Sequence, residues 1–199
     1  CYNTFLCNFN GKGNWLRIII LIQINCSRSK CKSYRWSLDL DISNLDKQLI
    51  FIGLNPSLSN STFLDNTTKK IIKISEKYNY GSVRIINLFG LISKDPKRLL
   101  LHKDPIGNIN NKIIKDSIQM WSRDLNCNIW LGWGNNGSFL GRNKSVYRLL
   151  KQYFYVKKNF FENPLRPLFI RKTKYNNPIH PLYCPNTSNL QEEDSLIFR

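Results

Sequence analysis

Four short apolar runs along the chain predict buried β-strands. They cover residues 48–54 (QLIFIGL), 83–88 (VRIINL), 128–133 (NIWLGW) and 168–170 (LFI). The first three end at or shortly before an Asn, Pro or Gly residue, which favours a turn at that point. Continuous apolar runs of this length are typical of strands that are covered on both faces.

Between these runs, apolar residues recur at the spacing of amphipathic helices. Residues 67–78, 111–124 and 146–153 place apolar side chains three or four positions apart, with lysines and other polar residues between them. Helices that alternate with buried strands indicate a parallel sheet. We therefore expect an α/β fold in three layers, with a mostly parallel four-stranded sheet and helices on both faces.

The pattern also predicts how the chain is divided. Residues 34–185 carry all of these elements and are expected to form a single α/β domain. Residues 1–33 form an N-terminal segment without a clear assignment, and residues 186–199 form a C-terminal tail. The apolar run at residues 16–24 contains Arg17 and Gln23 and is far shorter than the roughly 20 residues that cross a bilayer, so no membrane partner is expected.

Polar and glycine residues follow the predicted strands at corresponding points. Asn55, Asn87, Gly134 and His180 all lie at or just after a strand end or in the turn that follows it. In open parallel sheets, ligands bind outside the carboxyl ends of the strands. The four positions are therefore expected to converge on one edge of the sheet.

The charge of the chain favours an anionic partner. Lys and Arg number 30 against 13 Asp and Glu, which gives a formal net charge of +17 and a pI near 9.8. Such an excess attracts polyanions, so DNA or a nucleotide is the expected partner. The alternative is a compositional bias towards Asn, Ile and Lys, in which many lysines only solvate the surface.

The cysteines do not indicate a metal site. None of the six forms a close Cys-x-x-Cys pair, and the predicted core does not need disulfides. We expect reduced thiols in a cytoplasmic protein, no metal and no cofactor. The sequence does not indicate an oligomeric state.

An ordered set of short motifs resembles a known family. The set is Tyr34-Arg35-Trp36, Gly53-Leu54-Asn55-Pro56-Ser57, Asp65-Asn66-Thr67, Asn87-Leu88-Phe89, Asp104-Pro105-Ile106-Gly107, Trp133-Gly134 and Thr173 through His180-Pro181-Leu182-Tyr183. It resembles the family catalogued as domain of unknown function 1643. That family usually has Pro where this chain has Asn66, which weakens a role for Asp65, and Gly where it has Asn176. The family implies no activity.

The order of the motifs also resembles, more distantly, the uracil-DNA glycosylase superfamily. Mismatch-specific members carry a Gly-x-Asn-Pro loop after the first strand, and several members have an Asn in the next strand and a His-Pro motif near the C-terminus. The corresponding residues here are Gly53 to Pro56, Asn87 and His180-Pro181. The resemblance implies that fold and a glycosylase-like reaction on a base.

On this resemblance, His180 stabilises negative charge on the departing base, Asn55 holds the attacking water, and Asn87 pairs with a base edge. The catalytic candidates are Asn55 and His180. The candidates for binding the base or another ligand are Gly53, Pro56, Ser57, Asp65, Asn87, Trp133, Gly134 and Pro181.

Each candidate also has a structural interpretation. Asn55 is equally suited to capping a turn, Asn87 to satisfying backbone groups, and Trp133 to packing a strand end. Two other functions therefore stay open: a non-catalytic module that binds nucleic acid or a nucleotide, and a scaffold protein. A scaffold predicts that Asn55, Asn87 and His180 do not share one site.

Overall fold

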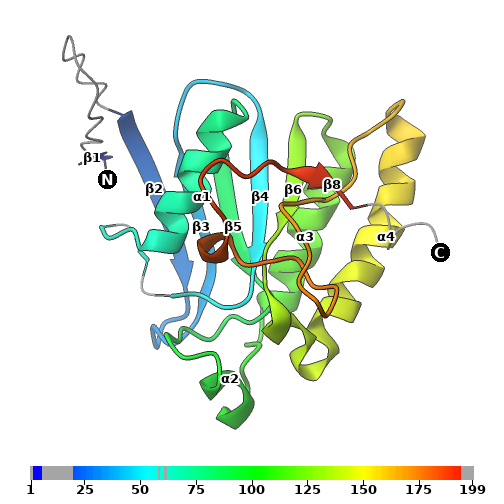
Figure 1. Ribbon diagram of the computed structural model, residues 1–199. Helices are drawn as coiled ribbons and strands as arrows, with labels where there is room; N and C mark the ends of the chain where they lie inside the picture. Colours follow the sequence, from blue (N-terminus) through cyan, green and yellow to red (C-terminus); the bar gives the residue numbers. More distant parts are fainter. Residues whose placement is uncertain (1, 6–19, 58, 61, 194–199) are drawn as a thin grey trace.

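The computed structural model describes residues 2–5, 20–57, 59–60 and 62–193, and all of its strands belong to one mixed sheet (Figure 1). The strand order is β1-β2-β3-β5-β4-β6-β7-β8. The strands are β1 Tyr2–Phe5, β2 Ile20–Arg28, β3 Arg35–Asp41, β4 Gln48–Gly53, β5 Ser82–Asn87, β6 Cys127–Leu131, β7 Leu168–Phe169 and β8 Gln191–Glu192.

The helices follow the same alternation that the sequence predicts. They are α1 Asn66–Lys77, α2 Arg98–Leu101, α3 Asn110–Arg123 and α4 Arg142–Phe160, with the 3-10 helices η1 Asn135–Gly141 and η2 Pro181–Tyr183. The three predicted helices correspond to α1, α3 and α4, and α4 is longer at both ends than the apolar pattern suggests.

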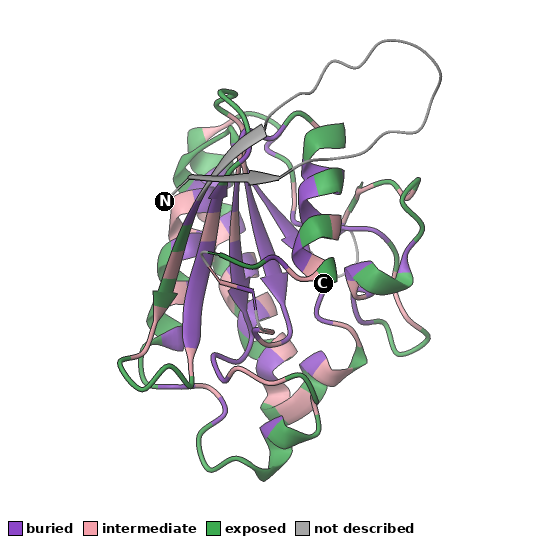
Figure 2. Cartoon of the chain, turned by 90° about the vertical axis from the view of Figure 1, so that its left-hand side faces the viewer, coloured by how far each residue is buried: buried purple, intermediate pink, exposed green. Residues whose placement is uncertain are grey.

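The centre of the sheet confirms the four predicted strands. β5, β4, β6 and β7 are neighbours in that order and run parallel to one another. Their residues are almost all buried, as Figure 2 shows for the middle of the molecule. A fully buried parallel strand needs apolar side chains on both faces, which explains the continuous apolar runs.

The prediction of a mostly parallel sheet of four strands is wrong, because antiparallel strands extend the sheet on both sides and make it mixed. β1, β2 and β3 lie beyond β5, and β8 lies beyond β7. β3 reads RWSLDLD and alternates apolar and polar residues, a pattern typical of antiparallel strands. β7 and β8 share only two residue pairs, too few to leave a periodic signal.

Two apolar layers separate the sheet from the helices on its two faces. On one face, Ile50, Ile52 and Leu131 pack with residues of α3 and α4, including Trp121 and Phe154. On the other face, Phe51 and Trp130 pack with α1 and with the segment around Ile179. The predicted three-layer arrangement is therefore confirmed.

No helix within the described ranges is long and apolar enough to span a membrane.

The sheet uses segments on both sides of the predicted 34–185 domain. Ile24 of β2 is buried in the core, and β2 pairs with β3 from Gln23↔Asp41 to Arg28↔Arg35. At the other end, Glu193 is fully buried and its backbone N–H donates to the carbonyl of Pro167 at 2.8 Å.

Deletion of residues 1–33 tests the predicted division. The deletion exposes the edge of β3 and removes Ile24 from the core, so we expect the free energy of unfolding to fall by about 3 kcal/mol or more. Urea denaturation of residues 34–199 and of the full chain measures the difference. Equal midpoints would show that the domain does not depend on β2.

Candidate functional site

The absence of a side chain at Gly53 makes room for the side chains of Asn87 and Phe51. These three residues form the floor of the predicted site. Gly53 at the end of β4 pairs with Asn87 at the end of β5. A methyl group added at Gly53 would lie 2.7 Å from Asn87 Oδ1 and 3.0 Å from the Phe51 ring. Asn87 therefore lies beside Phe51 on the α1 face of the sheet. Any residue larger than glycine at position 53 would occupy part of this space.

The Asn87 side chain has an unused donor in this floor. The residue is only 3% exposed, and its Nδ2 has no hydrogen-bond partner among the described residues. A buried amide N–H without a partner costs about 1–3 kcal/mol. Such a group is typical of a position that a ligand or an ordered water completes.

Pro181 borders the same floor, and His180 precedes it next to Gly134. A methyl group at Gly132 would lie 2.5 Å from the Phe51 ring and 3.2 Å from Pro181 Cδ, so the ring separates Asn87 from Pro181. A methyl group at Gly134 would lie 3.7 Å from His180 Cβ. The η2 segment also packs against α1, where Lys70 Nζ donates to the Cys184 carbonyl at 2.5 Å (Figure 1).

The imidazole of His180 has a defined orientation. Its Nδ1 accepts a hydrogen bond from the backbone N–H of Leu182 at 3.4 Å, so the neutral ring carries its proton on Nε2. Burial lowers the pKa of His180, and the negative charge of Asp65 acts in the opposite direction. At neutral pH the ring is therefore an uncharged donor through Nε2.

The loop between β4 and α1 is held by Asp65. Its Oδ1 accepts from the Thr68 N–H at 2.8 Å and caps α1, and Ser57 Oγ donates to Oδ2. The Asp65 N–H donates to Ser59 Oγ at 2.9 Å. The carboxylate thus has a structural role in the loop as well as an electrostatic effect on His180.

Arg35 is a buried cation beside this loop that the sequence reasoning did not select as a site residue. Its Nη1 donates to the Ser59 carbonyl at 2.9 Å, and Arg28 Nη2 donates to the same oxygen at 3.0 Å. Burial lowers the pKa of Arg35 to about 10, although the charge of Asp65 opposes the shift. The feature of the sequence that points to Arg35 is its place directly after Tyr34 in the first motif.

Asn55 is turned towards the backbone of neighbouring loops. Its Nδ2 donates to the carbonyls of Pro56 at 3.1 Å and Ser93 at 2.7 Å, and the Ser93 N–H donates back to the Pro56 carbonyl at 3.0 Å. These bonds tie the motif loop to the segment after β5. The Oδ1 of Asn55 is then the atom suited to bind water.

Trp133 lies apart from the other candidates. Its ring is buried in the layer with α3 and α4 and meets Tyr147 edge to face at 5.2 Å. Gly134, in contrast, has a φ of +70° and donates its N–H to the Pro178 carbonyl at 2.8 Å. The backbone at this position supports the His180 turn, while the Trp133 ring fills the core.

The sequence reasoning also missed Phe51 and Gly132. Phe51 is hidden inside a continuous apolar run, where nothing distinguishes a site aromatic from a core one. Its position two residues before Gly53 places both on the same face of the strand, and this was the signal that identifies it.

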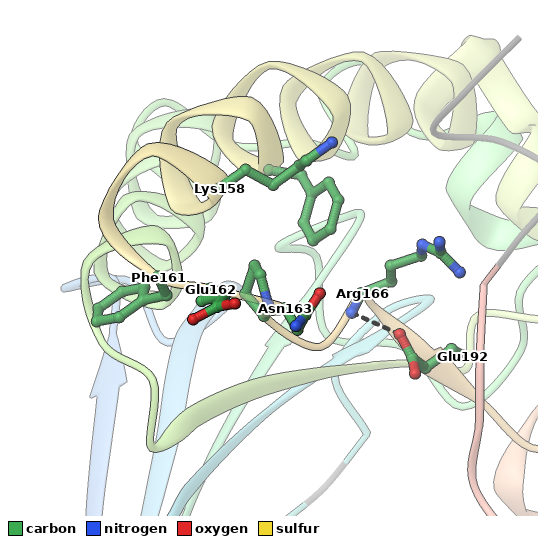
Figure 3. A pocket seen from close by; sticks show the side chains of 8 residues that line it. Lys158, Phe161, Glu162, Asn163, Arg166 and Glu192 are labelled. Carbon is green, nitrogen blue, oxygen red and sulfur yellow. Dashed lines mark hydrogen bonds between the residues drawn. The ribbon is translucent and has the colours of Figure 1, made fainter.

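A separate cavity lies at the opposite edge of the sheet, where β7 begins. Its volume is about 600 Å³, and Arg166 donates its backbone N–H to Glu192 Oε2 at 3.0 Å beside it (Figure 3). The lining residues are Phe154, Lys158, Phe161, Glu162, Asn163, Pro164, Arg166 and Glu192. None of them belongs to the predicted site.

Within the part of the chain that the structure describes, no group of three or more His, Cys, Asp or Glu residues is arranged to hold a metal ion.

The fold and the motif positions define an α/β protein with polar groups gathered at the carboxyl edge of its sheet. The family model described as "Protein of unknown function (DUF1643)" matches residues 35–182. The chain belongs to this family, as the ordered motifs predict. No curated protein and no solved structure matches the chain.

A double-mutant cycle tests the contact between Gly53 and Asn87. Gly53→Ala should lower the free energy of unfolding by about 1–3 kcal/mol, because the added methyl overlaps Asn87 Oδ1 and the Phe51 ring. In an Asn87→Ala background the cost should be smaller by about 0.5 kcal/mol or more, measured by urea denaturation. Equal costs in both backgrounds would show that the two residues do not share this space.

The pH dependence of stability tests the environment of His180. Because its pKa is lower in the folded protein than in the unfolded chain, protonation favours unfolding. The native protein should lose stability as the pH falls below about 6.5, the unfolded value. His180→Asn should lose less over the same range in urea titrations at pH 7 and pH 5. An equal loss of stability between pH 7 and pH 5 in the native protein and in His180→Asn would show that the His180 ring is exposed to solvent.

Proposed function

We propose that this chain is a glycosylase-like hydrolase that acts on a base in nucleic acid or in a nucleotide. The observation that carries the proposal is the unpartnered, buried Nδ2 of Asn87 beside Phe51. An amide that has a free N–H beside an aromatic ring suits the carbonyl edge of a flat heterocycle.

The neutral His180 ring supports the reaction itself. When an N-glycosidic bond breaks, the base leaves with the bonding electron pair and negative charge develops on its ring atoms. Water supplies the oxygen that bonds to the sugar carbon; one of its protons stays on this oxygen as the new sugar hydroxyl, and the other passes to the departing base, directly or through solvent. A donor fixed at His180 Nε2 stabilises the charge on a base oxygen without adding a cation.

Asn55 and Asp65 are suited to two other parts of the reaction, the attacking water and the charge on the sugar. The Oδ1 of Asn55 is the acceptor that orients the attacking water, since Nδ2 is used by two carbonyls. The carboxylate of Asp65 adds negative charge near the site, which favours the positive character that develops on the sugar.

The surface charge near the site favours a nucleic-acid substrate. Lys69 and Lys73 of α1 are exposed, as are Arg171 and Lys174 in the segment before His180. These cations are available to phosphates of a strand whose base enters the site.

A non-catalytic module that binds nucleic acid or a nucleotide is the second candidate. The observation that favours it is the use of Asn55 Nδ2 and of both Asp65 oxygens in bonds that hold the loop. In such a module the Asn87 and His180 donors recognise a base, but no side chain activates a water molecule.

Release of free base from oligonucleotides that carry uracil, other deaminated bases or modified bases tests the proposal. His180→Ala should lower turnover by roughly 100-fold or more with the fold intact, because one donor to the transition state is lost. Asn55→Ala should do likewise, and Asn87→Ala should chiefly change which base is accepted. His102→Ala is the matched control, since this exposed histidine should leave turnover unchanged.

The outcomes separate the two candidates. Full activity in a folded His180→Ala protein contradicts the enzyme function. Binding of an oligonucleotide that weakens log-linearly with salt and depends on Asn87, without release of base by the native protein, identifies the binding module instead.

A further inference from the structure

Arg142, the first residue of α4, is a buried guanidinium that lies outside the site described above. The residue is 7% exposed, and its Nε donates to the Leu88 carbonyl at 3.0 Å. Its Nη2 is enclosed and has no hydrogen-bond partner among the described residues. One of its strong donors is therefore unused in the interior.

No described carboxylate compensates the charge of Arg142. Burial lowers the pKa of Arg142, and no nearby charge contributes to the shift. An unpaired cation in the interior is costly, and buried charges in proteins are normally paired. By comparison, Arg35 is even more deeply buried but has the charge of Asp65 close by.

Asn110, the first residue of α3, supplies an unused acceptor beside it. The residue is fully buried, and its Nδ2 donates to the carbonyls of Asn87 and Leu88, both at 3.1 Å. Its Oδ1 has no partner in the described part of the chain. Because Asn110 and Arg142 donate to the same Leu88 oxygen, the two side chains lie together at the end of β5.

The N-termini of two long helices meet at this point. α3 begins at Asn110 and α4 at Arg142, and neither first turn contains an acidic residue or a side-chain cap. Helix N-termini carry partial positive charge from their free N–H groups, which favours a bound anion. The electrostatics of both helices thus have the same sign as the guanidinium.

We propose that Arg142 and Asn110 form a binding site for a phosphate group. A phosphate oxygen accepts from Arg142 Nη2, and a protonated phosphate oxygen donates to Asn110 Oδ1, so both unused groups are satisfied at once. A carboxylate ligand supplies the first bond but has no proton for the second. The site lies on the α3 and α4 side of β5, whereas the Asn87 side chain faces α1, so it does not rest on the proposed reaction.

Titration of the native protein with inorganic phosphate in 150 mM NaCl tests the site directly. Calorimetry should show saturable binding, and phosphate at about one hundred times its Kd should raise the Tm by roughly 5–10 °C. A nucleoside monophosphate titrated in parallel distinguishes the source of the group, since tighter binding than inorganic phosphate identifies a nucleotide. Absence of saturable binding in both titrations overturns the proposal.

Variants at the same helix separate the site from the overall charge. Arg142→Met should weaken phosphate binding about 10- to 100-fold, because a charged hydrogen bond is lost. Arg148→Met on the exposed face of α4 removes the same charge and should leave binding unchanged. Arg142→Lys keeps the charge without the two-nitrogen geometry and should bind with intermediate affinity, which provides a readout if the Met variant does not fold. Equal loss in Arg148→Met and Arg142→Met overturns the proposal.

Discussion

The space above Gly53 is the constraint on which the candidate site depends. A side chain at this position would overlap the Asn87 amide and the Phe51 ring, and the same ring lies against Gly132 and close to Pro181. Glycine at the end of β4 and directly after β6 therefore leaves room for a buried amide and an aromatic ring at the carboxyl ends of the strands. The parallel pairing Gly53↔Asn87 sets the relative height of the two residues, so a shift by one residue would move the amide to the other face.

The end of β5 provides polar groups to both faces of the sheet. Asn87 faces α1, while the next carbonyl, at Leu88, accepts from Arg142 and Asn110 on the side of α3 and α4. Both faces contain buried polar atoms without a described partner. Buried polar groups in native proteins are nearly always paired with protein atoms, ordered water or a ligand, and the two proposals above start from these atoms.

The sequence predicted the parts of the structure that rest on continuous patterns. The four central strands, the three main helices and their distribution on both faces follow from apolar runs and helical spacing. β3 was missed although its alternation of Trp36, Leu38 and Leu40 with polar residues was visible, and β8 was missed because two residues leave no period. The position of Asn87 beside Gly53 follows from parallel strand ends, whereas the burial of Arg142 depends on the packing of α4 and leaves no mark in a local pattern. The turn of Asn55 towards Ser93 likewise depends on a contact between distant loops.

Nuclear magnetic resonance of the Asn87 side-chain amide tests the central claim most directly. In a ¹⁵N-labelled protein, the Asn87 NH₂ resonances are assigned by their loss in Asn87→Asp, and free nucleobases are then titrated in. If this amide recognises a base, its resonances shift and saturate with a base that presents a carbonyl group, and the shifts are lost in Gly53→Ala. Saturable binding of bases that leaves the Asn87 amide resonances unchanged would contradict the account, as would the absence of any binding.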